Sequence, residues 1–168
     1  MQVRIIRSAN RRRTVQARVV NGEVVVRVPQ GMAAEEESRV VERLHRRLER
    51  RSAAKEVDLA ERAGRLADRH RLPLPSGIRW VSNQETLWGS CTPATGQVRI
   101  SDRMSGMPLW VLDYVLVHEL AHISQPGHGP AFWRLVDRYP LSERARGYLM
   151  ASGAGADLDG TDIDPVPA

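Results

Sequence analysis

This chain of 168 residues has only one cysteine and no long apolar stretch. Its single cysteine, Cys91, excludes a disulfide within the chain and suits the reducing cytoplasm. No apolar stretch approaches the roughly 20 residues of a membrane-spanning helix, and residues 1–4 lead into no signal-like apolar run. We therefore expect a cytoplasmic protein with no membrane partner. The sequence leaves its oligomeric state open.

Lysine is scarce as well, since 24 of the 25 basic residues are arginine. A GC-rich genome produces such a bias without any function. Residues 1–71 carry 18 basic and 10 acidic side chains, whereas residues 152–168 carry four aspartates. Between residues 42 and 56, arginines and glutamates alternate at spacings typical of ion pairs on a helix surface, with no aromatic residue among them to stack bases. A solvated helix is therefore favoured over a nucleic-acid groove, and nucleic acid is the alternative partner.

Histidines, by contrast, are concentrated, because three of the five lie within residues 118–128. His118 and His122 are four residues apart, so a helix places both imidazoles on one face. Glu119 lies one step round the same turn, and His128 follows beyond the helix. Three protein ligands are the set with which a catalytic zinc site keeps one position open. We expect His118, His122 and His128 to bind one Zn²⁺ ion.

The segment that carries this motif predicts a buried helix that begins near residues 107–108. Proline suits the first helical position, and apolar residues then surround the whole segment at helical spacing. Histidine and glutamate are costly in such surroundings unless a cation satisfies them. This argues against the alternative of two surface histidines on an ordinary helix. Residues 126–127, Pro-Gly, predict the end of the helix and a turn that returns His128.

The predicted chemistry is hydrolysis. Neutral imidazoles hold the zinc, which lowers the pKa of its bound water towards neutrality. Glu119 is then expected to accept a proton from that water and deliver it to the leaving group. The scissile bond stays open at this point. A phosphoanhydride of a nucleoside triphosphate, a phosphate-containing small molecule, is the alternative to a peptide bond, because zinc and nearby arginines suit phosphate as well.

The residues around the motif resemble a known family. They are the segments 88–92 (Trp-Gly-Ser-Cys-Thr), 96–101 (Gly-Gln-Val-Arg-Ile-Ser), 114–122 and 128–133. Together they resemble the YgjP-like metallopeptidase domain family, a minimal zincin group related in pattern to the SprT-like and WLM proteases. Metzincins share the histidine intervals, but Gln125 stands where their glycine lies and no convincing Met-turn follows.

The resemblance covers residues 3–150 and implies an α+β, zincin-like fold. A small antiparallel or mixed sheet would pack against the HExxH helix, with an N-terminal β-hairpin and long helices. The implied function is a zinc metallopeptidase acting on peptides or proteins, with a nucleic-acid-associated protease or binding module of SprT or WLM type as the alternative.

The patterns predict one domain over residues 1–151, followed by a disordered acidic tail over 152–168. The domain comprises an N-terminal hairpin (1–30), a helical part (33–71) with a break near residues 51–52, and a catalytic part (78–151). Predicted strands lie at 3–7, 14–20, 23–28, 78–82 and 97–101, and predicted later helices begin near residues 130 and 142.

The resemblance also implies where a substrate binds. Residues 97–101 are the candidate edge strand that pairs with an extended peptide, an ordinary sheet strand being the alternative. The candidate substrate-binding residues are Trp88, Gly89, Ser90, Gln97, Val98 and Arg99. Cys91 is favoured as a small buried residue over a nucleophile.

Supporting residues are harder to rank from the sequence. Carboxylates that can orient a ligand imidazole are Asp113, Asp137 and Glu143. Groups that can stabilise an oxyanion are Tyr139, Arg144, Arg146 and Tyr148. Phe132 and Trp133 are expected to be core residues that brace His128.

Overall fold

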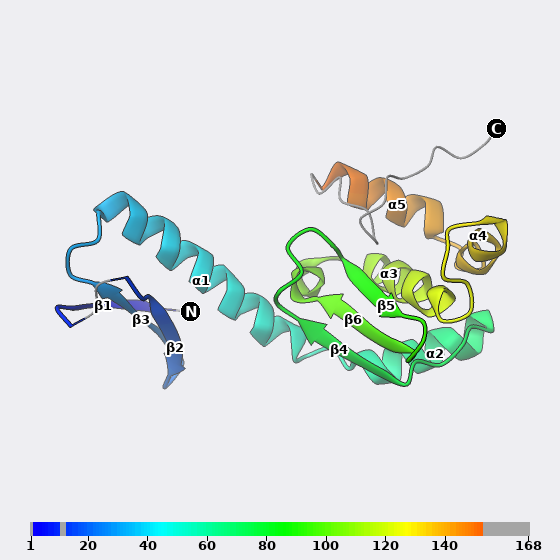
Figure 1. Cartoon of the computed structure of the whole chain (residues 1–168), viewed down its shortest axis with the longest axis horizontal. Coiled ribbons are helices and arrows are strands. Elements are labelled where there is room, and N and C mark those ends of the chain that lie inside the picture. Colours follow the sequence, from blue (N-terminus) through cyan, green and yellow to red (C-terminus); the bar gives the residue numbers. More distant parts are fainter. Residues whose placement is uncertain (1, 11–12, 153–168) are drawn as a thin grey trace. The chain divides into compact units, whose positions relative to one another are not determined.

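The computed structural model describes residues 2–10 and 13–152 and divides the chain into two compact units, Met1–Ser52 and Ala53–Ala168 (Figure 1). Each unit has its own hydrophobic cluster. The sequence predicts one domain over residues 1–151, and within this range valines and leucines of the first unit form a small hydrophobic core of their own. Residues 153–168 of the predicted tail lie outside the described residues.

The first unit holds a three-stranded sheet and one long helix. Its strands are β1 (Val3–Ser8), β2 (Gln16–Val20) and β3 (Glu23–Pro29), in the order β1-β3-β2, and the helix is α1 (Ala34–Ala54). Strand β1 runs parallel to β3, and β2 runs antiparallel to it. The predicted hairpin joins β2 to β3 through Asn21 (φ 50°) and Gly22 (φ 81°). Two consecutive positive φ angles favour an Asn-Gly turn, which explains the strength of this signal.

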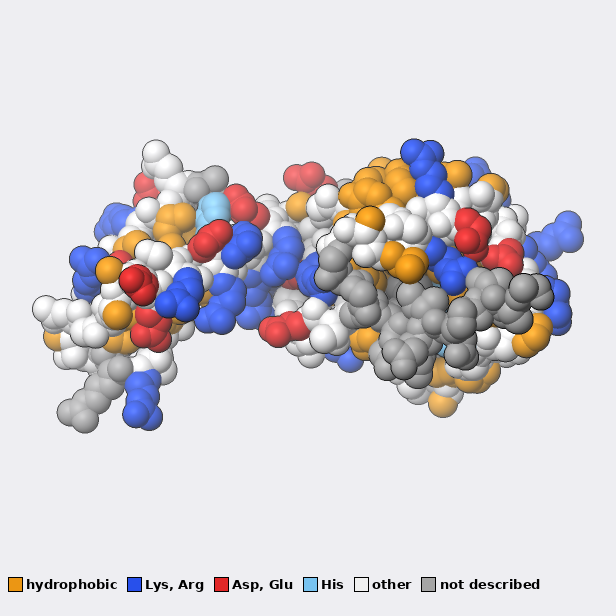
Figure 2. Space-filling model, turned by 90° about the horizontal axis from the view of Figure 1, so that it is seen from above, with side chains coloured by type: hydrophobic (Ala, Val, Ile, Leu, Met, Phe, Trp, Pro, Cys, Tyr) orange, Lys and Arg blue, Asp and Glu red, His pale blue; other side chains and the backbone are white. Residues whose placement is uncertain are grey.

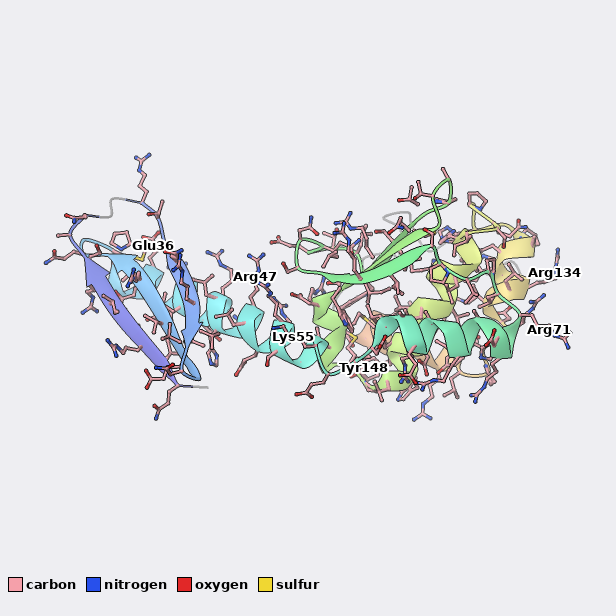
Figure 3. The ribbon with its side chains drawn as sticks, turned by 90° about the horizontal axis from the view of Figure 1, so that it is seen from below. Glu36, Arg47, Lys55, Arg71, Arg134 and Tyr148 are labelled. Atoms are coloured by element: carbon pink, nitrogen blue, oxygen red, sulfur yellow. The ribbon has the colours of Figure 1, made fainter. Side chains whose placement is uncertain are left out.

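Helix α1 covers one face of this sheet. The side chains of Val24, Val26 and Val28 alternate along β3 towards the helix and pack against Val41, Leu44 and Leu48. On the solvent side of α1, basic and acidic side chains lie next to one another (Figure 2), and Arg47 projects outward (Figure 3). This is the solvated, ion-paired helix surface that the charge pattern predicts.

The predicted break in the helical region lies later than residues 51–52. Helix α1 ends at Ala54, and helix α2 (Leu59–His70) begins after Asp58. The Asp58 carboxylate accepts a hydrogen bond from the backbone N–H of Glu61 at 2.9 Å. An aspartate at this position satisfies an N–H that the first turn leaves open, so the cap sets the start of α2.

The second unit contains the sheet of β4 (Gly77–Val81), β5 (Gly89–Thr92) and β6 (Gln97–Ser101), in the order β4-β6-β5. Strand β4 is parallel and β5 antiparallel to β6. Two predictions are corrected here. Residues 88–96, where no strand is predicted, contain β5, and residues 97–101, predicted as an edge strand, form the central strand. The Gly-Ser-Cys-Thr segment lacks the apolar alternation that marks a strand.

Helix α3 (Leu109–His122) is the buried centre of the second unit, and all its residues from Val111 are buried except Asp113. Strand β6 leads to it through a short 3-10 helix, η1 (Asp102–Gly106), while α4 (Pro130–Val136) and α5 (Ser142–Ala151) follow. Pro108 caps α3 rather than opening its first turn. Among the described residues, no helix combines the length and apolar character needed to cross a bilayer.

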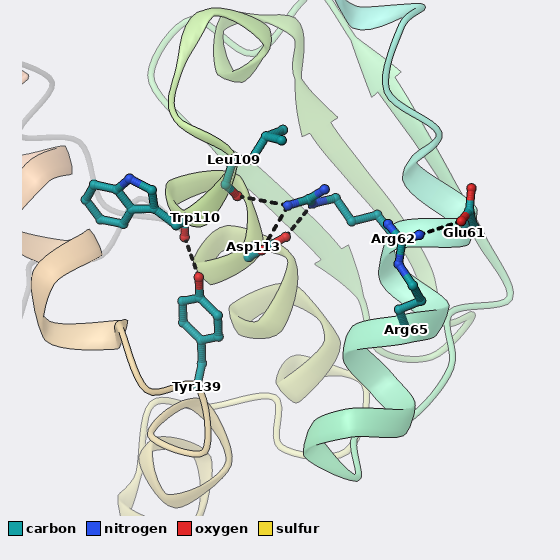
Figure 4. A network of polar contacts seen from close by, with 7 residues as sticks. All are labelled: Glu61, Arg62, Arg65, Leu109, Trp110, Asp113 and Tyr139. Carbon is teal, nitrogen blue, oxygen red and sulfur yellow. Dashed lines mark hydrogen bonds and ion pairs between the residues drawn. The ribbon is translucent and has the colours of Figure 1, made fainter.

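The first turn of α3 is held from two sides (Figure 4). The Arg62 guanidinium of α2 binds the Asp113 carboxylate through two nitrogens, one of them at 2.9 Å. The Tyr139 hydroxyl donates to the Trp110 carbonyl at 2.9 Å. Because a helix transmits such restraints along its axis, these contacts help to fix the position of its last turn, where the histidines lie.

Candidate metal centre

The last turns of α3 carry the motif in the interior of the second unit. The exposed fractions of His118, Glu119 and His122 are only 2%, 0% and 4%. Helix α3 ends at His122, four residues before the predicted Pro-Gly stop. The loop 123–129 then brings His128 back, and α4 begins at Pro130 as predicted, with Gly129 as its N-cap. Proline at the first helical position loses no needed hydrogen bond, which explains this boundary.

The three predicted ligands converge. The Nε2 atom of His118 lies 3.1 Å from that of His122 and 3.2 Å from that of His128. One candidate ligand atom from each residue lies within 4.8 Å of the others. In a tetrahedral zinc site, bonds of 2.0–2.1 Å separate two nitrogens by about 3.4 Å. The nitrogen-rich donor set and its spacing therefore fit a divalent ion of this kind.

A backbone carbonyl orients one of these imidazoles. The Nδ1 atom of His122 lies 3.1 Å from the carbonyl oxygen of Gln125. A carbonyl only accepts, so Nδ1 carries the proton and Nε2 is left to bind a cation. Gln125 is the residue that separates this chain from the metzincin pattern. Its position just after α3 brings its carbonyl back to His122.

Two of the three carboxylates predicted for this orienting role bind arginines instead. Asp113 binds Arg62, and Glu143 forms an ion pair with Arg146 at 3.0 Å. Asp137 ends helix α4 as its C-cap. The carbonyl of Gln125 could not be predicted from the sequence, because every residue has a backbone carbonyl whatever its side chain.

Aromatic rings enclose the histidines. The Phe132 ring stacks on His122 with centroids 4.4 Å apart, and the Trp133 ring stacks on His128 at 5.7 Å. Phe132 is fully buried, and both rings also contact the His118 imidazole edge-on. The predicted bracing role of Phe132 and Trp133 thus extends to all three histidines. The packing restricts their rotamers before any ion binds.

Strand β5 lies directly against the predicted general base. A Cβ atom at Gly89 would lie 2.5 Å from Oε1 of Glu119, closer than real carbon and oxygen atoms approach. Only glycine therefore leaves the carboxylate in its place. Next to it, Trp88 is buried and has the Arg103 guanidinium 4.1 Å from its ring centroid.

Ser90 has a partner that the sequence analysis missed. The Gln84 side chain donates to the Ser90 hydroxyl at 2.7 Å, and the Gln84 carbonyl accepts from Ser101 at 3.1 Å. Gln84 is buried in the loop between β4 and β5. A single glutamine in a polar loop belongs to no sequence pattern, so the sequence could not identify Gln84 as the partner of Ser90. Because side chains alternate, Ser90 lies on the face of β5 opposite to that of Gly89.

The remaining predicted substrate residues have other roles in the second unit. Val98 is a core residue, the Gln97 amide donates to Ser76, and Arg99 donates to Asn83 at 2.8 Å. Because β6 pairs with a strand on each side, its backbone N–H and C=O groups are already hydrogen-bonded and cannot pair with a substrate strand. The reason for assigning Gln97, Val98 and Arg99 to substrate binding is thereby removed.

Most of the predicted oxyanion-stabilising groups also face elsewhere. Tyr139 and Tyr148 contact Trp110, and the Arg144 guanidinium lies 4.9 Å from the centroid of that ring. Arg146 lies 5.0 Å from the ring centroid of Trp133, which itself stacks on His128.

Tyr114, which the sequence analysis did not single out, lies closer to the motif. Its buried ring is 6.2 Å from that of His118. Burial raises the pKa of its hydroxyl, so Tyr114 stays protonated and neutral at physiological pH.

Comparisons with known proteins agree with this arrangement. The fold resembles the crystal structure of the metallopeptidase zymogen of Pyrococcus abyssi abylysin, with a TM-score of 0.50 and 17% identity over 55% of this chain and 92% of that one. This likeness confirms the predicted α+β, zincin-like fold. No curated protein matches the sequence. Residues 51–149, more than half of the chain, match the family described as YgjP-like, metallopeptidase domain. The chain therefore belongs to the YgjP-like metallopeptidase domain family.

Proposed function

We propose that this chain is a zinc-dependent peptidase in which His118, His122 and His128 hold one Zn²⁺ ion and Glu119 is the general base. The observation that carries the proposal is the convergence of three imidazole nitrogens in the buried last turns of α3, with Glu119 on the same turn. Membership of a metallopeptidase family supports the reaction class.

The bound zinc would supply a Lewis acid that acidifies water and polarises the attacked carbonyl oxygen. The chain's own groups do the rest. Glu119 accepts the proton of the attacking water and then donates it to the leaving nitrogen, so that one carboxylate acts first as base and then as acid. The Gln125 carbonyl keeps the proton of His122 on Nδ1. Gly89 leaves the room that the Glu119 carboxylate occupies.

We propose β5, in place of residues 97–101, as the strand that pairs with the substrate backbone. The Ser101 N–H donates to the Trp88 carbonyl at 2.9 Å, which makes these two a hydrogen-bonded pair. Antiparallel pairs alternate, so Gly89 and Ile100 form the next, non-hydrogen-bonded pair. The N–H and C=O of Gly89 therefore point away from β6, to the side of β5 on which no described strand pairs. A substrate strand added there would lie beside Glu119.

The test combines metal analysis of the purified protein with a screen of unstructured peptides and nucleoside triphosphates. We expect about one zinc per chain, hydrolysis of peptides, and no turnover by Glu119→Gln although this variant keeps its zinc. A protein that holds no metal overturns the proposal. Turnover of triphosphates alone, abolished in Glu119→Gln, would replace the peptide bond by a phosphoanhydride and leave the metal site intact.

A further inference from the structure

The sheet of the first unit has one face that α1 does not cover. Side chains alternate along β3, so Val24, Val26 and Val28 face the helix whereas Val25 and Arg27 face the other way. The register places Arg4 of β1 and Arg18 of β2 on either side of Val25.

Three arginines of this face, Arg4, Arg18 and Arg27, are all exposed. We call the surface formed by these three arginines and Val25 the open sheet face.

Charge is segregated between the two sides of this unit. Residues 2–33 contain seven arginines and one glutamate, Glu23, whereas residues 34–52 contain six arginines and five glutamates. On α1, Arg39 and Arg46 pair with glutamates four residues away. No ion pair with another described residue involves Arg4, Arg18 or Arg27. A genome-wide preference for arginine would act equally on helix and sheet, so it does not explain this segregation.

We propose that the open sheet face binds the phosphate backbone of nucleic acid. Two strand spacings separate Arg4 from Arg18 by about 10 Å, and Arg27 follows Val25 on the same face about 7 Å along β3. Guanidinium groups bind phosphate oxygens in a two-pronged geometry, and three such groups on one face of a sheet can contact several phosphates of one chain. The aliphatic stems of the arginines can lie over Val25 and the partly buried Ile6.

The same surface predicts binding without sequence preference. Residues 2–29 contain no histidine, phenylalanine, tyrosine or tryptophan, so the strands of this sheet offer no ring to stack a base. Contacts to phosphate position a protein on nucleic acid but do not read the bases. The interaction is independent of the metal centre, because every residue that carries it belongs to the first unit.

The experiment measures fluorescence anisotropy of labelled single-stranded RNA, single-stranded DNA and duplex DNA with the full-length protein at several salt concentrations. The variant is the triple change Arg4→Gln, Arg18→Gln and Arg27→Gln. Its matched control is Arg39→Gln, Arg43→Gln and Arg46→Gln on α1, which removes the same charge from the same unit. Thermal melts of each variant report folding, and the three single variants replace the triple if it does not fold.

We expect the triple variant of the open sheet face to lose at least tenfold in affinity. The slope of log K against log salt should fall by about two to three, since each lost phosphate contact removes about 0.7 to 0.9. The α1 control should stay within about threefold. Equal losses in both variants would show attraction to net charge only and overturn the proposal. The proposal would also be overturned if the protein bound no nucleic acid at low salt. Binding of anionic lipid vesicles through these arginines, without binding of nucleic acid, would overturn it as well.

Discussion

Gly89 and Glu119 lie so close together that a Cβ atom on Gly89 would stand 2.5 Å from Oε1 of Glu119. The contact joins the outer strand of the sheet to the buried helix that carries the histidines. Because the backbone of β5 forms one wall of the space around the carboxylate, the position of the proposed base depends on a residue with no side chain.

Gly89→Ala is therefore expected to displace the Glu119 carboxylate. A shift of about 1 Å in a reacting group can lower turnover by about a hundredfold. We expect kcat to fall by that order, with zinc content unchanged, because the three atoms nearest to the new methyl group all belong to Glu119 and not to a histidine. Steady-state kinetics on a peptide substrate and metal analysis of the same preparation check both parts.

The control for this variant is Gly64→Ala on α2, where a Cβ meets no atom within 4 Å. Alanine is favoured over glycine in a helix by about 1 kcal/mol, so this variant should melt higher and keep full activity. If Gly89→Ala were as active as Gly64→Ala, the contact with Glu119 would have no part in catalysis.

Removal of a ligand should abolish zinc binding. His122→Ala deletes one of three converging imidazoles and leaves the Gln125 carbonyl without its donor. We expect loss of stoichiometric zinc, and loss of the stabilisation that zinc gives the wild type, about 2.7 kcal/mol when free zinc is 100 times the Kd. Melting curves with and without a chelator measure this. His45→Ala, on α1, is the matched control and should keep both zinc and the chelator response.

Two arginines on α2 offer a comparison of ion pairs. The Arg62 and Asp113 side chains are 18% and 17% exposed, whereas those of Arg65 and Glu61 are 63% and 64% exposed. Arg62→Leu leaves the mostly buried Asp113 carboxylate without its ion-pair partner. It should lower the free energy of unfolding by about 2 kcal/mol. Arg65→Leu should change it by about 0.5 kcal/mol or less. Urea denaturation of both variants tests this, and equal effects would contradict the role of Arg62 in holding α3.

How much of the site the sequence predicts depends on the range of the interactions involved. The helical period alone places His118 and His122 on one face, and the apolar residues around them predict the burial of α3. The hairpin follows from Asn21 and Gly22 because the turn is local. These features need no knowledge of distant contacts.

The order of strands in the second sheet could not be predicted in this way. Strand β5 consists of Gly-Ser-Cys-Thr, which has no apolar alternation, and its position at the edge is decided by pairing with β6. The resemblance to the family implies an edge strand at residues 97–101, and no local pattern in residues 89–92 speaks against it. The contact between Gly89 and Glu119 and the carbonyl of Gln125 depend on the same long-range packing, so neither leaves a local pattern.

The pH dependence of stability should contain a contribution from His70. Its side chain is buried at the end of α2, edge-on to the Tyr139 ring at 5.7 Å, and burial lowers its pKa. The unfolded chain, with a histidine pKa of about 6.5, then binds more protons than the folded chain between the two pKa values. The stability that depends on neutral His70 is therefore complete above about pH 6.5 and is lost as the pH falls towards the folded-state pKa.

Other groups of the protein also respond to pH, so the measurement is a difference between two variants. The free energy of unfolding of the wild type minus that of His70→Gln should be largest near pH 8. It should shrink as the pH falls to 5, with a slope of at most about 1.4 kcal/mol per pH unit. The groups that both proteins share contribute equally to the two stabilities, so their contribution cancels. A difference that stays constant from pH 8 to pH 5 would mean that His70 binds its proton equally in the folded and unfolded chains.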